Sequence, residues 1–258
     1  MNLVDYHTHP YSHGEIDLYT VYSKEYLSKF IRKADEREIK YLGFSDHDYL
    51  LIDLNINKLK QIINTIPFNI SIGLEFDFYP GKEEEIRQVI EQYSLDYAIG
   101  SVHHIKEWAF DHPDYIDHYK DKDIDNLYTE YFQLVQQAAC SGLFDIIGHI
   151  DLIKVFGYRP SKIDILVLIE PVLTEIKKQG MAIEVNTNGL NKPVAEMYPS
   201  LPILKKAIEY DIPITFGSDA HSPEQTGAGI KEAACLAGNL GLKKVAIFKE
   251  RTMKLIDL

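Results

Sequence analysis

The segment LVDYHTH, residues 3–9, joins a short apolar run to two histidines, and the same arrangement recurs six more times along the chain. The other runs lead into FSDH (44–47), GLEFD (73–77), SVHH (101–104), GHID (148–151), EVN (184–186) and FGSDAH (216–221). Short β-rich runs that end in such side chains are typical of strands in a parallel α/β sheet or barrel, where chemistry lies at the carboxyl ends of the strands. The recurrence therefore predicts one site that several strands build together.

Segments with helical periodicity lie between these runs. Ser23 is the expected N-cap of a helix, and further helices are expected over residues 82–93, 123–141, 163–179, 201–210 and 224–240. Pro171 is expected to kink the 163–179 helix or to split it in two. Because no linker or repeat interrupts the alternation, residues 1–258 are predicted to form a single α/β barrel-like domain.

The composition indicates a soluble globular protein, with 45% hydrophobic and 26% charged residues. No apolar stretch approaches the ~18 residues of a membrane span, and Asp5 and His7 interrupt the start of the chain, so neither a membrane nor a signal peptide is expected. The two cysteines, in helical-looking segments, indicate a reducing compartment, and a cytoplasmic location is expected. The net charge of −12 argues against a nucleic-acid polymer as partner but permits a small anionic substrate beside a metal cluster.

Two pairs of residues at i, i+2 spacing and one glutamate are the clearest candidate metal ligands. His7 and His9 are two residues apart, so in a strand both imidazoles point to the same face. Asp219 and His221 repeat this spacing at the end of the last run. Glu75 ends a β-rich run, and a carboxylate there can bridge two ions. Histidine and carboxylate ligands without cysteine suit zinc, manganese or iron.

The remaining candidate ligands are histidines at the ends of other runs. His149 is flanked by isoleucines and alone would be read as a core residue, but its place in the series predicts a ligand. Adjacent strand residues face opposite sides, so only one of His103 and His104 is expected to point into the site. His13 and His47 complete the predicted set.

The connection over residues 104–122 is long and aromatic, reading HIKEWAFDHPDYIDHYKDK, and contains the one tryptophan, Trp108. A loop of this length directly after a candidate ligand is usually a lid or a binding loop. His104 and Trp108 are therefore candidate substrate contacts. The alternative is a surface excursion anchored by its aromatic residues.

Taken together, HTH, FSDH, GLEFD, GSVHH, GHID, EVNT and FGSDAH resemble the polymerase and histidinol phosphatase (PHP) superfamily, and most closely its monofunctional histidinol phosphate phosphatases. The resemblance covers nearly the whole chain, including YPS (198–200) and IFKER (247–251). It implies a distorted (β/α)7 TIM-like barrel with three divalent transition-metal ions, commonly zinc, iron or manganese. It also implies a metal-dependent phosphatase that takes a small phosphorylated metabolite, L-histidinol phosphate, in histidine biosynthesis.

The resemblance also implies how the ligands divide among the ions. By position, one ion lies on His7, His9, Glu75 and Asp219; a second shares Glu75 and takes His103 and His149; a third takes His47, His221 and His13. The third site departs from the family pattern, because the loop after the HxH reads HTHPYSH (7–13) where many relatives have HTHTPxCxxH.

A second departure concerns phosphate recognition. Relatives often carry an arginine in a GLRK stretch after EVNT, whereas this chain reads GLNK and has Asn191. Lys192 and Arg159 are the candidates to replace the missing guanidinium, with Lys154 and Arg251 as further basic groups.

The candidate catalytic groups are Glu75, His221 and Asp46, of which Asp46 is a possible proton donor to the leaving alkoxide. No serine or cysteine stands in a nucleophile motif, so direct attack by water is favoured. Three alternatives stay open: a PHP phosphoesterase acting on a nucleotide or another small ester, a metal amidohydrolase, and a non-catalytic metal-binding module. An amidohydrolase usually needs a bridging lysine at a strand end, and no run here ends in lysine.

Overall fold

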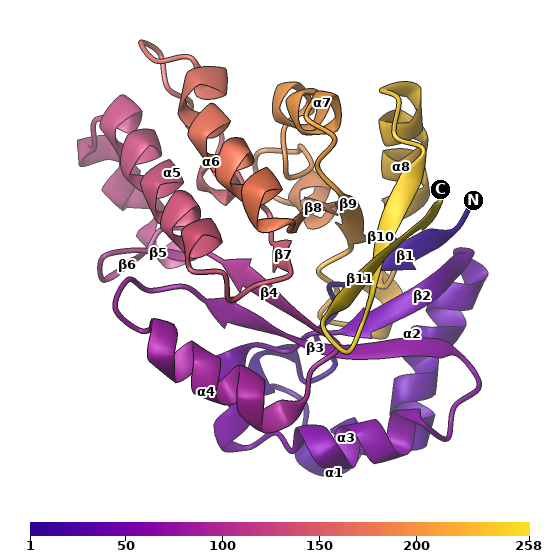
Figure 1. Cartoon of the computed structure of the whole chain (residues 1–258). Coiled ribbons are helices and arrows are strands. Elements are labelled where there is room, and N and C mark those ends of the chain that lie inside the picture. Colours follow the sequence, from indigo (N-terminus) through magenta and orange to yellow (C-terminus); the bar gives the residue numbers. More distant parts are fainter.

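The computed structural model describes residues 1–258, and parallel strands form its centre (Figure 1). Their order is β1 (Leu3–Asp5), β2 (Ile39–Phe44), β3 (Asn69–Asp77), β4 (Tyr97–Ser101), β7 (Ile146–Ile147), β8 (Ala182–Asn186) and β9 (Ile214–Gly217). Backbone hydrogen bonds of 2.8 Å from Tyr6 N to Phe216 O and from His9 N to Ala220 O bring the last strand back to the first. The strands thus form a nearly closed seven-stranded barrel, and the predicted (β/α)7 fold is confirmed.

Helices surround this barrel, with α5 to α8 along one side and α1 to α4 along the other (Figure 1). Ser23 caps α2 by accepting a hydrogen bond from Tyr26 N at 3.3 Å, as its sequence position predicts. The helices are α1 (Leu18–Val21), α2 (Lys24–Glu36), α3 (Ile56–Ile63), α4 (Glu83–Tyr93), α5 (Ile124–Cys140), α6 (Ile165–Gln179), α7 (Leu201–Glu209) and α8 (Ile230–Asn239). None of them combines the length and the apolar character needed to cross a membrane.

One helix start needs correction, and one of the two alternatives given for Pro171, a split of its helix, is excluded. Helix α8 begins at Ile230 rather than near residue 224, because Gly227 and Gly229 adopt φ values of 71° and 73°, which lie outside the right-handed helical region. Helix α6 is not split at Pro171 but continues through it. Pro171 has no N–H to donate to the carbonyl of Val167, one turn earlier in the helix. Both residues lie on the exposed side of the helix, so water can bond to that carbonyl instead.

A C-terminal hairpin covers the amino ends of the barrel strands. Strands β10 (Lys244–Lys249) and β11 (Thr252–Asp257) pair antiparallel, and Arg251 N donates to Asp96 O just before β4. The Phe248 ring meets the Tyr6 ring edge-on at 5.5 Å between centroids. This hairpin leaves the carboxyl ends of the strands, at the opposite end of the barrel, as the open face.

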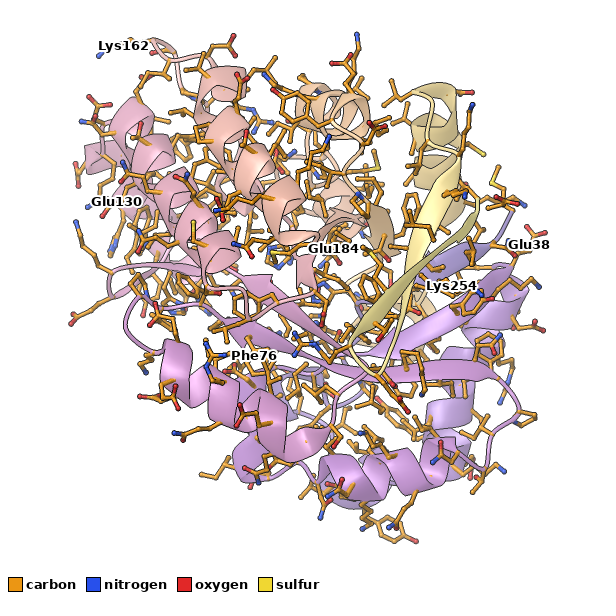
Figure 2. The ribbon with its side chains drawn as sticks, viewed as in Figure 1. Glu38, Phe76, Glu130, Lys162, Glu184 and Lys254 are labelled. Atoms are coloured by element: carbon orange, nitrogen blue, oxygen red, sulfur yellow. The ribbon has the colours of Figure 1, made fainter.

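Buried and exposed side chains separate as expected for such a barrel. Figure 2 shows Phe76 and Glu184 inside the molecule, and both are almost completely buried. Glu38, Lys162 and Lys254 lie at its surface. Glu184 is a carboxylate in the core, and a buried charge of this kind needs partners.

The connection over residues 104–122 has its own local structure. Strands β5 (His104–Ile105) and β6 (Trp108–Ala109) form a small antiparallel hairpin, and a 3-10 helix follows over Pro113–Asp121. The segment is therefore folded against the barrel rather than being an irregular loop.

Candidate metal centre

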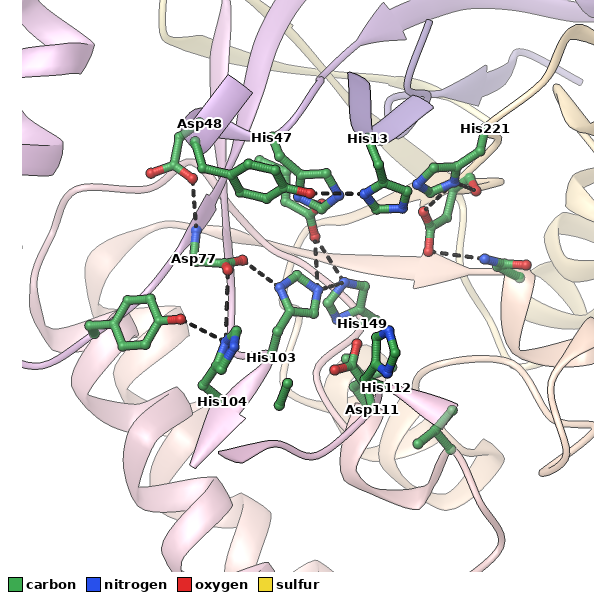
Figure 3. Close-up of a pocket in the computed structure, with 18 of the residues that line it drawn as sticks. His13, His47, Asp48, Asp77, His103, His104, Asp111, His112, His149 and His221 are labelled. Carbon is green, nitrogen blue, oxygen red and sulfur yellow. Dashed lines mark hydrogen bonds and ion pairs between the residues drawn. The ribbon is translucent and has the colours of Figure 1, made fainter. Parts of the chain in front are cut away.

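A cavity of about 900 Å³ opens at the carboxyl ends of the strands, and histidines and carboxylates line its floor. Figure 3 shows His47, His103, His149 and His221 converging there from different strand ends. The chain places these residues together because each follows directly after a buried strand, and parallel strands end at the same edge.

Glu75 lies at the centre of the cluster and is almost completely buried. Its Oε2 atom lies 3.3 Å from His7 Nε2 and 3.6 Å from His9 Nε2. Asp219 Oδ1 lies 3.4 Å from His9 Nε2 and 4.0 Å from His7 Nε2. These four side chains therefore surround one point, and they come from β3 and from the segments that follow β1 and β9.

The other oxygen of Glu75 belongs to a second group. Glu75 Oε1 lies 2.9 Å from His149 Nε2 and 3.5 Å from His103 Nε2, and the two Nε2 atoms are 3.3 Å apart. Glu75 thus presents one oxygen to each group, which is the geometry of a bridging carboxylate.

A third group consists of His9, His47 and His221, whose ligand atoms all lie within 4.8 Å of one another. The His13 ring stacks on this group, with its centroid 4.3 Å from that of His221 and 4.9 Å from that of His47. His13 Nδ1 is hydrogen bonded to Tyr49 Oη at 2.9 Å. The shortened HTHPYSH loop therefore brings His13 to the cluster, through a left-handed backbone with φ of 55°.

Metal cations fit this donor set. Several buried imidazole nitrogens have no hydrogen-bond partner, namely His7 Nε2, both nitrogens of His9 and His47, His149 Nδ1 and His221 Nε2. Burial alone would raise the pKa of Glu75, but the surrounding histidines outweigh it and hold the pKa well below its usual range. Burial would also raise the pKa of Asp219, but His7 and His9 outweigh it and hold this pKa well below its usual range. Ionised carboxylates beside unpaired imidazole nitrogens are the donors that zinc, iron and manganese bind.

Two further carboxylates orient the histidines from behind. His7 Nδ1 donates to Glu184 Oε1 at 2.6 Å, and His103 Nδ1 donates to Asp77 Oδ1 at 2.5 Å. Although burial opposes protonation, Glu184 together with Glu75 raises the pKa of His7 well above its usual value, and Asp77 does the same for His103. Each bond fixes the protonated nitrogen and turns the other nitrogen towards the cluster.

Sequence reasoning did not assign these orienting roles. Glu184 follows the apolar run 181–183 and Asp77 lies two residues after Glu75, so both were visible only as ligand-type residues. Glu184 also accepts a hydrogen bond from His149 N at 2.8 Å, and a Cβ atom at Gly217 would lie 2.0 Å from Glu184 Oε1. The glycine before the SDAH segment is therefore required by this close approach.

The predicted substrate-binding residues divide into two groups. His104 and Lys192 line the cavity, and His104 Nδ1 is hydrogen bonded to Tyr79 Oη at 2.7 Å. Trp108, Arg159 and Asn191 do not line it. The long connection contributes to the cavity wall through Ala109, Asp111, His112 and Pro113 instead.

The side chains of Trp108, Arg159 and Lys154, which do not line the cavity, contact other residues of the chain. The Trp108 ring packs against the Tyr119 ring at 4.9 Å, and Arg159 pairs with Glu196 at 2.8 Å. Lys154 is fully buried and pairs with Asp151 at 2.9 Å.

Arg251 and Asp46 are also outside the cavity lining. Arg251 pairs with Asp145 at the amino end of the barrel. Asp46 is buried and accepts a hydrogen bond from Tyr11 N at 2.9 Å.

Comparison with known proteins agrees with this geometry. The PHP domain family matches residues 5–188. A protein of Deinococcus radiodurans named "Probable histidinol-phosphatase" is 40% identical over 187 residues, which cover 72% of this chain and 70% of the relative. A second "Probable histidinol-phosphatase", from Clostridium acetobutylicum, is 28% identical over 255 residues, covering 92% of this chain and 97% of the relative.

A solved structure has the same fold. Histidinol phosphate phosphatase from Lactococcus lactis, crystallised with zinc, L-histidinol and phosphate, matches with a TM-score of 0.76 and 21% identity. The match covers 98% of this chain and 99% of the other.

Proposed function

This chain belongs to the PHP domain family, and from that membership we propose that it is a metal-dependent phosphatase that hydrolyses L-histidinol phosphate to L-histidinol and phosphate. The observation that carries the proposal is the position of Glu75, with one carboxylate oxygen facing each of two groups of histidines at the carboxyl ends of the strands. The reaction belongs to histidine biosynthesis.

The chain's own side chains prepare this site for hydrolysis. Divalent cations held by the three groups would activate water and neutralise the charge that develops on the phosphate. Glu184 and Asp77 keep the Nε2 atoms of His7 and His103 directed at those positions. The cavity lining contains no serine, threonine or cysteine, so direct attack by water is favoured over a phosphoenzyme.

The charges of the cavity wall fit the organic part of the substrate. Asp48, Asp77, Glu85 and Asp111 line the cavity in addition to the carboxylates of the cluster. L-Histidinol carries an ammonium group and an imidazole, and carboxylates are the partners that such groups need. Lys192 is a cation of the lining that can face the phosphate.

The experiment is a comparison of kcat/KM for L-histidinol phosphate with a panel of nucleotides and sugar phosphates, using protein purified without chelator. L-Histidinol phosphate should be preferred by at least about tenfold, or roughly 1.4 kcal/mol of transition-state discrimination. Glu75→Gln, purified in parallel, measures any contaminating phosphatase. Preference for a nucleotide or a sugar phosphate would mean that the chain is a PHP phosphoesterase with a different substrate.

A further inference from the structure

Tyr198 is a buried residue of the cavity wall that the metal cluster does not explain. Its side chain is 1% exposed and lines the cavity, yet its hydroxyl has no hydrogen-bond partner. Other buried tyrosines are satisfied: Tyr97 Oη donates to Tyr6 O at 2.8 Å and Tyr128 Oη donates to Tyr158 O at 2.6 Å. An unpaired buried hydroxyl costs free energy in the folded protein, so its retention points to a ligand.

The Tyr198 ring is held in place from several sides. Its backbone forms an antiparallel bridge with Asn186, with N to O distances of 2.6 and 2.9 Å. Lys154 Nζ lies 5.1 Å from the ring centroid, and the same ammonium donates to Met197 O at 2.6 Å. A Cβ atom at Gly189 would lie 2.8 Å from Tyr198 Cε2, so the ring occupies the space that a side chain would take. The hydroxyl is therefore preorganised.

The position of the ring indicates which part of a substrate it meets. Its centroid lies 6.3 Å from that of His149 in an edge-to-face arrangement, beside the group formed by Glu75, His103 and His149. Three of the four carboxylates that fit the cationic part of the substrate lie on other elements: Asp48 follows β2, Asp77 is on β3 and Glu85 is on α4, whereas Asp111 follows β6. At neutral pH a phenol is an uncharged O–H donor, which suits an anionic oxygen.

We propose that the Tyr198 hydroxyl donates a hydrogen bond to a phosphate oxygen of the bound substrate. The inference rests on the proposed phosphatase function and deepens it. It also accounts for the GLNK departure, because Asn191 and Arg159 lie outside the cavity and supply no contact there. A neutral donor on a fixed ring would then act beside the Lys192 ammonium, which lines the same cavity.

The test compares Tyr198→Phe with Tyr128→Phe, each of which removes one buried hydroxyl. The affinity of the metal-loaded protein for inorganic phosphate is measured by calorimetry and by competitive inhibition of p-nitrophenyl phosphate hydrolysis. Tyr198→Phe should weaken phosphate binding by about tenfold or more, the usual effect of losing a hydrogen bond to a charged group. Its bound metal and its affinity for L-histidinol should equal those of the wild type, and its melting temperature should not fall, because the hydroxyl that is removed has no partner in the protein.

Tyr128→Phe should show the opposite pattern, with a lower melting temperature and unchanged phosphate affinity. Unchanged phosphate affinity in Tyr198→Phe would overturn the proposal, and so would loss of metal or a shift of the defect to L-histidinol. These readouts use inorganic phosphate and p-nitrophenyl phosphate, so they stand even if the wild type prefers a substrate other than L-histidinol phosphate.

Discussion

Glu75 is the single side chain on which most of the metal site depends. Its two oxygens lie within 3.6 Å of nitrogen atoms of five histidines: His7, His9, His47, His103 and His149. His13 lies at the edge of the third group and is bonded to Tyr49. Glu75→Gln keeps the shape of the side chain but removes its charge, so it should lose more metal than His13→Ala. Elemental analysis of both variants, purified without chelator, measures this difference.

His112→Ala is the matched control, because His112 lines the same cavity but belongs to none of the ligand groups. It should retain the metal content of the wild type. Equal losses in Glu75→Gln and His13→Ala would show that Glu75 does not bridge.

The convergence of the candidate ligands could be predicted from sequence because each follows a short apolar run, and parallel strands bring such positions together. The roles of single atoms could not be predicted in this way. His7 and Glu184 are 177 positions apart, and which imidazole nitrogen meets which carboxylate depends on side-chain packing across the barrel. The unpaired hydroxyl of Tyr198 is likewise a property of the folded chain, since the YPS motif alone does not show what its tyrosine contacts.

At the scale of elements, Asp125 ties the first turn of α5 to the segment before α6. Its buried carboxylate accepts hydrogen bonds from Lys162 N and Ile163 N, both at 2.8 Å, and from Ser161. Burial raises the pKa of Asp125, but the backbone donors outweigh it and the net shift is downward. Stability from this group is therefore present above the unfolded-state pKa of about 3.9 and is lost as pH falls towards the lower folded value.

Asp125→Asn should consequently lower the melting temperature at pH 7, and the difference from wild type should shrink as the pH falls below about 4. Thermal unfolding followed by circular dichroism across this range measures the effect. Asp123→Asn is the control, because Asp123 caps α5 through Asn126 N and asparagine caps a helix equally well. A pH-independent difference for Asp125→Asn would mean that the charge of the carboxylate contributes nothing.

Most long elements could be predicted from periodicity, as the agreement between residues 82–93 and α4 (Glu83–Tyr93) shows. The failures have physical causes. Periodicity does not reveal that Gly227 and Gly229 delay the start of α8, or that the exposed side of α6 tolerates Pro171. The β10–β11 hairpin was also missed. Its position at the amino ends of the barrel strands depends on contacts with Tyr6 and Asp96, two residues that are far from the hairpin in sequence.

At the scale of the whole molecule, the metal centre connects nearly every strand of the barrel. The candidate ligands come from the ends of β1, β2, β3, β4, β7 and β9, and Glu184 on β8 is hydrogen bonded to His7. These side chains come together only when the barrel is closed. Cations that bind the folded chain and not the unfolded one stabilise the fold by mass action.

Removal of metal should therefore lower the melting temperature of the entire chain. At a free metal concentration about 100 times Kd the stabilisation is about 2.7 kcal/mol, which corresponds to roughly 5–10 °C for a chain of this size. Calorimetry before and after treatment with a chelator, followed by dialysis to remove the chelator, measures the shift, and added zinc or manganese should restore the original value. In Glu75→Gln the same treatment should have a smaller effect, because less metal is bound at the start. If elemental analysis shows that metal has left the wild type while its melting temperature stays the same, the ions do not join the strands, and the barrel closes through its backbone hydrogen bonds and core alone.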